Sequence, residues 1–181
     1  MKRIQILFVG VIIFILFVPS ISQSRTLTLN NTPIQVYFSP NGGCTEAIIQ
    51  TIIQAKTEIL IQAYSFTSQP IAKALLQAYK KGIKVQAILD KSQKSERYTS
   101  AAFLANSGIP TFIDSTHAIA HNKIMIIDQE TVITGSFNFT KSAEEKNAEN
   151  LLIIKSKELA KAYIENWNQH RKHAEPYQAR Y

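Results

Sequence analysis

The side chains best suited to catalysis lie in one short segment, between positions 121 and 138. It follows the pattern H-x-K, four residues, D, six residues, G-S-x-N, which here provides His121, Lys123, Asp128, Ser136 and Asn138. An imidazole can attack or exchange a proton near neutral pH, while an ammonium, a hydroxyl and an amide can hold negative charge. These are the groups needed to cleave a phosphodiester without a metal ion. The pattern occurs once in the chain.

Strand geometry divides these residues into two groups. His121 and Lys123 are two positions apart and point to the same face of a strand. Ser136 and Asn138 likewise share a face on the returning strand of a hairpin. Asp128 lies an odd number of positions from His121 and would point to the opposite face. We therefore interpret Asp128 as a structural residue near the hairpin turn rather than as an acid that contacts substrate.

The elements that must position this segment alternate along the chain. β-branched and apolar runs alternate with helical stripes in the first half, and hairpins dominate the second. We predict strands over 34–38, 58–66, 83–89, 109–113, 123–128, 131–134 and 150–154. We predict helices over 45–56, 69–81 and the second half of 91–106, and a short polar helix or a loop over 141–147. A last helix is capped by Ser156, and we expect a frayed tail after Arg171.

The pattern predicts a single α/β domain with a mixed β-sheet and helices on both faces. The tight turn of the hairpin is expected at Gln129-Glu130. Gly135 is expected to let the backbone approach a ligand closely, because it has no side chain.

The N-terminus has the layout of a secretory signal peptide over residues 1–24. Lys2 and Arg3 precede an apolar run over 4–18, which is short for a membrane span of about 20 residues. We expect cleavage, a mature domain over 25–181 in the periplasm or secreted, and no stable membrane association afterwards. An uncleaved anchor is the alternative.

Charge and cysteine content narrow the possible partners and sites. The chain carries a net charge of +7, and loss of the two basic residues of the signal peptide leaves 7 − 2 = +5. A basic surface suits a polyanion such as nucleic acid, or an anionic lipid surface. Cys44 is the only cysteine, which excludes an internal disulfide and a cysteine-rich zinc site. We expect a buried thiol, with pairing between chains as the alternative.

The segment from His121 to Asn138 resembles the signature of the phospholipase D superfamily. The chain over 34–168 resembles the small, single-motif bacterial endonucleases of that superfamily, and further similar segments are found at 63–68, 138–141 and 147–150. The resemblance implies the phospholipase D/nuclease fold and no metal or other cofactor. It also implies that DNA is the substrate, with RNA as a further candidate.

The resemblance assigns a role to each residue. His121 attacks phosphorus and forms a phosphohistidine, while Lys123, Ser136 and Asn138 bind the phosphate. Glu149 best matches the downstream carboxylate that orients the attacking imidazole. A solvated charge at a strand edge is the alternative for Glu149.

The single copy of the motif predicts a homodimer. In-line displacement needs a nucleophile on one side of phosphorus and a general acid on the other, and one motif provides one suitable histidine. The remaining histidines have no matching lysine or hydroxyl partner; they are His117, His170 and His173. A two-fold dimer would bring two copies of His121 together, as the resemblance to the small family members implies.

Two other functions remain open on the sequence. A phospholipase D acting on phospholipid head groups would use the same chemistry, and a non-catalytic nucleic-acid-binding module would keep only the fold. A basic stretch at Lys91, Lys94 and Arg97 could contact backbone phosphates, or could be an ordinary solvated loop.

Overall fold

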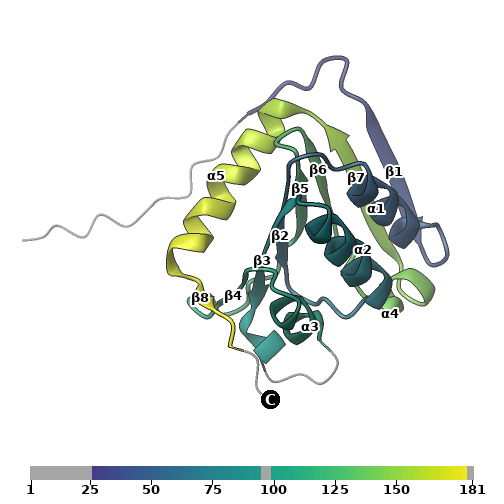
Figure 1. Cartoon of the computed structure of the whole chain (residues 1–181). Coiled ribbons are helices and arrows are strands. Elements are labelled where there is room, and N and C mark those ends of the chain that lie inside the picture. Colours follow the sequence, from purple (N-terminus) through teal and green to yellow (C-terminus); the bar gives the residue numbers. More distant parts are fainter. Residues whose placement is uncertain (1–25, 95–98, 179–181) are drawn as a thin grey trace, which may run out of the picture.

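An eight-stranded mixed β-sheet forms the centre of the computed structural model, which describes residues 26–94 and 99–178 (Figure 1). The spatial order of the strands is β1-β7-β6-β5-β2-β3-β4-β8. Only the β2–β3 and β3–β4 pairs are parallel. The strands are β1 Ile34–Ser39, β2 Glu58–Ala63, β3 Lys84–Asp90, β4 Thr111–Asp114, β5 Lys123–Ile127, β6 Thr131–Gly135, β7 Glu149–Lys155 and β8 Glu175–Pro176.

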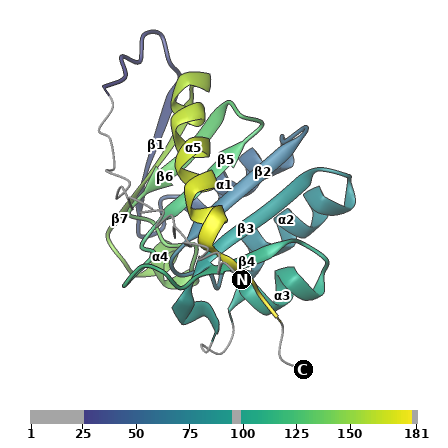
Figure 2. The same ribbon diagram turned by 90° about the vertical axis from the view of Figure 1, so that its left-hand side faces the viewer.

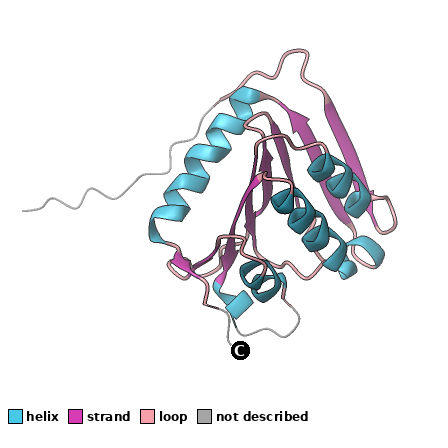
Figure 3. Cartoon of the chain, in the orientation of Figure 1, coloured by secondary structure: helices cyan, strands magenta, loops and turns pink. Residues whose placement is uncertain are grey.

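Helices cover both faces of this sheet, as predicted. α1, α2 and α3 lie on one face, and α5 crosses the other (Figures 1 and 2). Figure 3 shows the short helices near the ends of the strands. The helices are α1 Cys44–Ile53, α2 Gln69–Lys80, the 3₁₀ turn η1 Lys91–Lys94, α3 Ser100–Asn106, α4 Lys141–Glu145 and α5 Lys157–His173.

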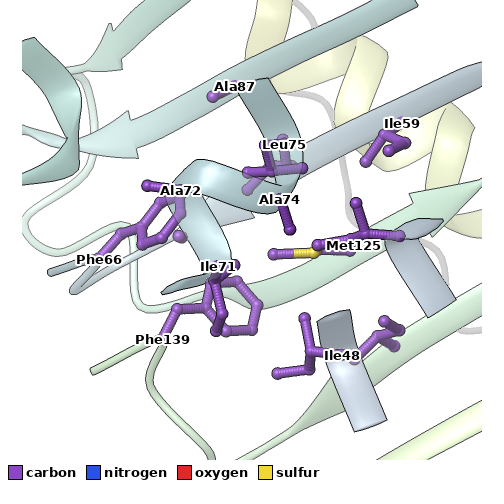
Figure 4. Close-up of a cluster of buried hydrophobic side chains, with 14 of the residues drawn as sticks. Ile48, Ile59, Phe66, Ile71, Ala72, Ala74, Leu75, Ala87, Met125 and Phe139 are labelled. Atoms are coloured by element: carbon purple, nitrogen blue, oxygen red, sulfur yellow. The ribbon is translucent and has the colours of Figure 1, made fainter. Parts of the chain in front are cut away.

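The larger core lies between the sheet and the helices α1 and α2. Ile48 and Leu75 point from the two helices towards the strands, and Met125 fills the space between them (Figure 4). Phe66 and Phe139 meet edge to face, with ring centroids 5.8 Å apart, at the end of this core. Their backbones also form an isolated parallel bridge. The chain after β2 is thereby tied to the chain after β6, where the catalytic candidates lie.

The second core lies beneath α5 and does not reach β1. Trp167 of α5 is buried and donates from Nε1 to the carbonyl oxygen of Ile61 at 3.0 Å, which fixes the helix to β2. At the sheet edge, Ile34, Val36 and Phe38 remain 48%, 51% and 66% exposed. We call these three residues the β1 stripe. It lies on the α5 side of the sheet because Tyr37, which alternates with it, packs into the opposite core.

Two local predictions were wrong. The hairpin turns at Asp128 and Gln129, whose φ angles of 54° and 56° mark the tight turn, rather than at Gln129-Glu130. Residues 172–176 are not frayed, because α5 continues to His173 and Glu175 then pairs with Ile113 of β4. Neither Gly nor a periodic apolar run signals these features in the sequence.

Cys44 is a buried free thiol at the start of α1, as expected. Burial, with a smaller contribution from the negative charge of Glu144, raises the pKa of Cys44 to about 11. The thiol is therefore uncharged and unreactive at neutral pH.

The predicted signal peptide over 1–24 lies outside the described residues, as does Arg97 of the basic stretch. None of the helices in the described ranges has the length and apolar character needed to cross a membrane. The export of the chain stays a prediction.

Candidate active site

All but one of the predicted site residues lie at the same end of the sheet, which we call the site edge because several strands begin or end there. β2 and β6 end at this edge, whereas β5 and β7 begin there, because these neighbours are antiparallel. The register places Lys123 opposite Ala63, and the β1–β7 pair places Glu149 opposite Ser39. Strand ends thus bring together residues that are far apart in the sequence.

His121 is an exposed side chain just before β5. Its ring lies 4.6 Å from the ring of Tyr64, centroid to centroid, at an interplanar angle of 56°. Within the described chain no hydrogen bond holds the His121 imidazole, so both ring nitrogens can meet a substrate or a partner group. Tyr64 follows β2, and only the family-like segment 63–68 pointed to it in the sequence.

Lys123 sits behind His121 and is buried. Its Nζ donates to the carbonyl oxygen of His121 at 3.0 Å and lies 5.1 Å from the centroid of the Tyr64 ring. Burial lowers the pKa of Lys123, and the negative charge of Glu149 opposes that shift. An ammonium in this position has lost much of its hydration, so an anionic ligand beside it would be bound more strongly than in water.

Glu149 lies at the same end of the sheet, at the start of β7. Its Oε1 accepts a hydrogen bond from Asn147 Nδ2 at 3.3 Å, and its backbone N–H donates to Ser39 Oγ at 3.2 Å. No hydrogen bond joins Glu149 to His121 among the residues that the structure places. The orienting contact implied by the resemblance is therefore not made within this single chain.

The electrostatic link between Glu149 and Lys123 can be tested directly. Glu149→Gln is expected to lower the pKa of Lys123, because it removes the charge that opposes the effect of burial. The measurement is a titration of ¹³C-labelled lysine Cε resonances followed by NMR. Glu145→Gln removes a carboxylate that pairs with the exposed Lys141 and should leave Lys123 unchanged. An equal pKa of Lys123 in the Glu149→Gln variant and the unmodified protein would contradict the link.

Ser136 is held by a reciprocal pair of hydrogen bonds with Asn150. The Ser136 N–H donates to Asn150 Oδ1 at 2.8 Å, and the Asn150 N–H donates to Ser136 Oγ at 3.0 Å. Gly135 adjoins this pair, and a Cβ there would collide with the backbone oxygen of Asn150. The close approach at Gly135 is thus to β7 and not to a ligand as expected. The Ser136 hydroxyl accepts one bond and keeps its own proton to donate.

Asn138 lies between two fully buried rings, Phe137 and Phe139, which anchor the segment in the core. Its Oδ1 is buried and has no hydrogen-bond partner in the described chain. An unsatisfied buried amide atom is costly, and such atoms often belong to ligand sites. Rotation of the amide would present its NH₂ group at the same point, where an anionic oxygen can accept.

Asp128 lies at the opposite end of β5 from His121. Its carboxylate accepts bonds from the backbone N–H groups of Lys56, Thr57 and Glu58 at 2.8, 2.7 and 3.1 Å, and from Thr57 Oγ1 at 2.8 Å. Burial by itself would raise the pKa of Asp128, but these bonds outweigh it and lower the pKa. The residue thus fastens the hairpin turn to the start of β2.

Asp128→Ala is expected to lower the free energy of unfolding by about 2 kcal/mol, because four hydrogen bonds are lost at a partly exposed site. Asp128→Asn should lose less, since asparagine keeps one acceptor oxygen and tolerates the positive φ. The measurement is urea unfolding across a pH series.

The lowered folded pKa of Asp128 fixes the sign of the pH effect. The stabilisation that Asp128 provides is fully present above the pKa of an unfolded aspartate, about 3.9. It is lost as the pH falls through the lower pKa of Asp128 in the folded protein. The Asp128→Asn variant should lack this acid-dependent loss. Equal stability of all three proteins at neutral pH would contradict the fastening role.

Comparisons with family models, with known proteins and with solved structures agree. Residues 48–171 match the family model described as cardiolipin synthase, PLD-like domain. A protein named phospholipase D from Rickettsia prowazekii is 38% identical over 161 residues, covering 82% of this chain and 78% of the relative. The crystal structure of Nuc from Salmonella typhimurium, a phospholipase D family member, superposes with a TM-score of 0.78 at 41% identity, covering 81% of this chain and 99% of that one.

The structure of NucT from Helicobacter pylori has a TM-score of 0.74 at 23% identity, which supports the fold. Mitochondrial cardiolipin hydrolase from dog is a more distant relative, 24% identical over 163 residues.

Proposed function

Because the chain belongs to the phospholipase D superfamily, as a Nuc-like phosphodiesterase, we propose that it is a metal-independent, sequence-nonspecific endonuclease that hydrolyses DNA, with RNA as a further substrate. The observation that carries the proposal is the exposed His121 ring, which has no hydrogen bond within the described chain, next to the buried ammonium of Lys123, which donates to the His121 carbonyl oxygen. The net charge of +7 supports a polyanionic substrate.

The proposed reaction has two displacements. A ring nitrogen of His121 attacks phosphorus, the bond to the leaving oxygen breaks, and a phosphohistidine forms. Water then attacks the same phosphorus and releases the imidazole. Lys123 neutralises the developing charge, while the Ser136 hydroxyl and the Asn138 amide donate to the non-bridging oxygens.

In this proposal, Glu149 orients the attacking imidazole of His121. A carboxylate that accepts from one imidazole nitrogen leaves the other nitrogen free to attack. In the single chain, Glu149 Oε1 accepts a hydrogen bond from Asn147, and no hydrogen bond joins Glu149 to His121 among the described residues. We therefore assign that bond to the assembled, substrate-bound enzyme.

The second imidazole is proposed to come from a second copy of the chain. One motif provides one nucleophile, and protonation of the leaving oxygen needs an acid on the far side of phosphorus. The β1 stripe supports such a dimer, because large apolar side chains in contiguous exposed positions indicate an interface. The stripe ends beside Ser39, which pairs with Glu149 at the site. A two-fold partner on this stripe would therefore lie next to the strand ends that hold the proposed catalytic residues.

A phospholipid substrate is the second candidate. Relatives carry the name phospholipase D, and Ile119, two residues before His121, is 58% exposed and could contact an apolar chain. The same phosphohistidine chemistry would serve both substrates.

The test uses the purified protein in EDTA with supercoiled plasmid, single-stranded RNA and cardiolipin-containing vesicles in parallel. We expect nicking and linearisation of the plasmid without added metal. Release of phosphatidic acid without DNA cleavage would transfer the assignment to a phospholipase. DNA retention on a gel without any cleavage would leave a binding module and contradict both.

A further inference from the structure

Three of the four histidines in the chain gather around one carboxylate, in a cluster that does not include His121. Asp114 ends β4, His117 follows it in the loop to β5, and His170 and His173 lie one turn apart at the end of α5. The short strand β8 brings the chain back along β4 directly after α5 (Figure 1). That pairing holds the last turn of the helix against Asp114.

The four side chains converge on a small volume. His117 Nδ1, His170 Nδ1 and His173 Nε2 lie 3.0, 2.7 and 3.2 Å from Asp114 Oδ2. The four potential ligand atoms all lie within 4.8 Å of one another. In a tetrahedral site with bonds of about 2.0–2.1 Å, ligand atoms are roughly 3.3 Å apart, so small side-chain rotations suffice to surround one ion.

The position of the carboxylate also suits a cation. Asp114 is fully buried at the centre of the cluster. Its Oδ1 accepts from the Thr116 N–H at 3.1 Å, which fixes the orientation of the carboxylate.

We propose that Asp114, His117, His170 and His173 form a tetrahedral binding site for a zinc ion. Three imidazoles and one carboxylate are borderline ligands that favour Zn²⁺, whereas Mg²⁺ and Ca²⁺ prefer sites made of oxygen atoms. Four protein ligands leave no open position for substrate, so the ion is structural rather than catalytic.

The site links the end of α5 to the loop that presents the nucleophile. His117 lies four residues before His121, and Asp90 and Lys91 hold the same loop through Ala120 N–H and the His117 carbonyl at 2.7 and 3.1 Å. A single cysteine cannot form an internal disulfide, and a bound ion would instead crosslink the end of α5 to β4 and the loop that follows it.

The test begins with protein freed of metal by EDTA and dialysis, to which ZnCl₂ is added. We expect one Zn²⁺ per chain by calorimetry, and an increase in Tm of about 5–10 °C at a hundredfold excess over the dissociation constant. Co²⁺ should give the visible absorption typical of a tetrahedral site. MgCl₂ and CaCl₂ should have no such effect.

Two variants identify the ligands without removing buried groups. His117 and His173 are 45% and 32% exposed, so His117→Gln and His173→Gln should still fold. Each should weaken Zn²⁺ binding at least about 100-fold, more than the loss of an outer-shell contact. The matched control is His121→Gln, which changes the remaining histidine and should bind Zn²⁺ as the unmodified protein does.

Zn²⁺ binding that is unchanged in both ligand variants, or absent from the unmodified protein, would overturn the proposal and leave a hydrogen-bonded cluster only. The outcome is separate from the proposed nuclease activity. The zinc-loaded and metal-free forms should cleave plasmid equally at 20 °C if the ion is structural, and failure to bind zinc leaves the EDTA assay unaffected.

Discussion

His121→Ala is expected to lower the rate of DNA cleavage by at least about 10³-fold while leaving the fold intact. The loss is large because the proposed reaction forms its covalent intermediate on this imidazole. The stability should change by less than about 0.5 kcal/mol, since the ring is exposed and packs against Tyr64 at the surface. The measurements are plasmid cleavage in EDTA and thermal unfolding.

A chemical control separates loss of the nucleophile from loss of binding. Substrate carrying a radioactive phosphate at the cleaved bond should leave label on the unmodified protein after an alkaline quench, and none on the His121→Ala variant. The variant should still retain DNA on a gel, because Lys123 and the remaining basic residues are unchanged. More than a tenth of the normal activity in the variant would rule out His121 as the nucleophile.

Val36→Asp is expected to separate the proposed dimer and to reduce cleavage at least about 100-fold at dilute concentrations. Val36 is the middle residue of the β1 stripe, and a two-fold interface buries it twice. Each unpaired carboxylate in an apolar interface costs roughly 3 kcal/mol or more, so one of the two alone corresponds to about a 100-fold weaker association, and both together to more. The measurement is analytical ultracentrifugation, with activity followed over a range of protein concentrations.

Ile53→Asp is the matched control for this experiment. Ile53 and Val36 are both 51% exposed, but Ile53 ends α1 on the opposite side of the sheet from the stripe. This variant should remain dimeric and active. A Val36→Asp protein that sediments as a monomer yet cleaves normally would contradict the shared active site, and one that remains dimeric would place the interface elsewhere.

The hairpin pattern of the sequence predicted which residues of the motif lie together. His121, Lys123, Ser136 and Asn138 reach the same end of the hairpin, but β5 begins at Lys123 and β6 ends at Gly135, so the alternation expected for His121, Ser136 and Asn138 does not apply to them. Asp128 was placed at the turn by the same reasoning. These predictions needed only local geometry and the fact that a hairpin returns to its starting edge.

Contacts between distant segments could not be predicted in this way. Tyr64 reaches His121 because β2 and β5 are neighbours, which depends on strand order rather than on any local pattern. His170 and His173 read as polar positions at the end of a basic helix. Their approach to Asp114 depends on β8, a strand of two residues that carries no periodic signal.

The number of residues between Lys123 and Asn138 is constrained by the hydrogen bonds that attach the hairpin turn to the start of β2. Lys123 and Asn138 belong to the open end of the hairpin, while Asp128 binds the backbone of 56–58 at its closed end. Adding one residue to both strands near the turn would preserve the faces at the open end but carry Asp128 away from its partners. Adding one residue to a single strand would shift the register and turn Ser136 and Asn138 away from His121. The hairpin can therefore change in length and keep the candidate catalytic residues together only when both strands change by the same number of residues.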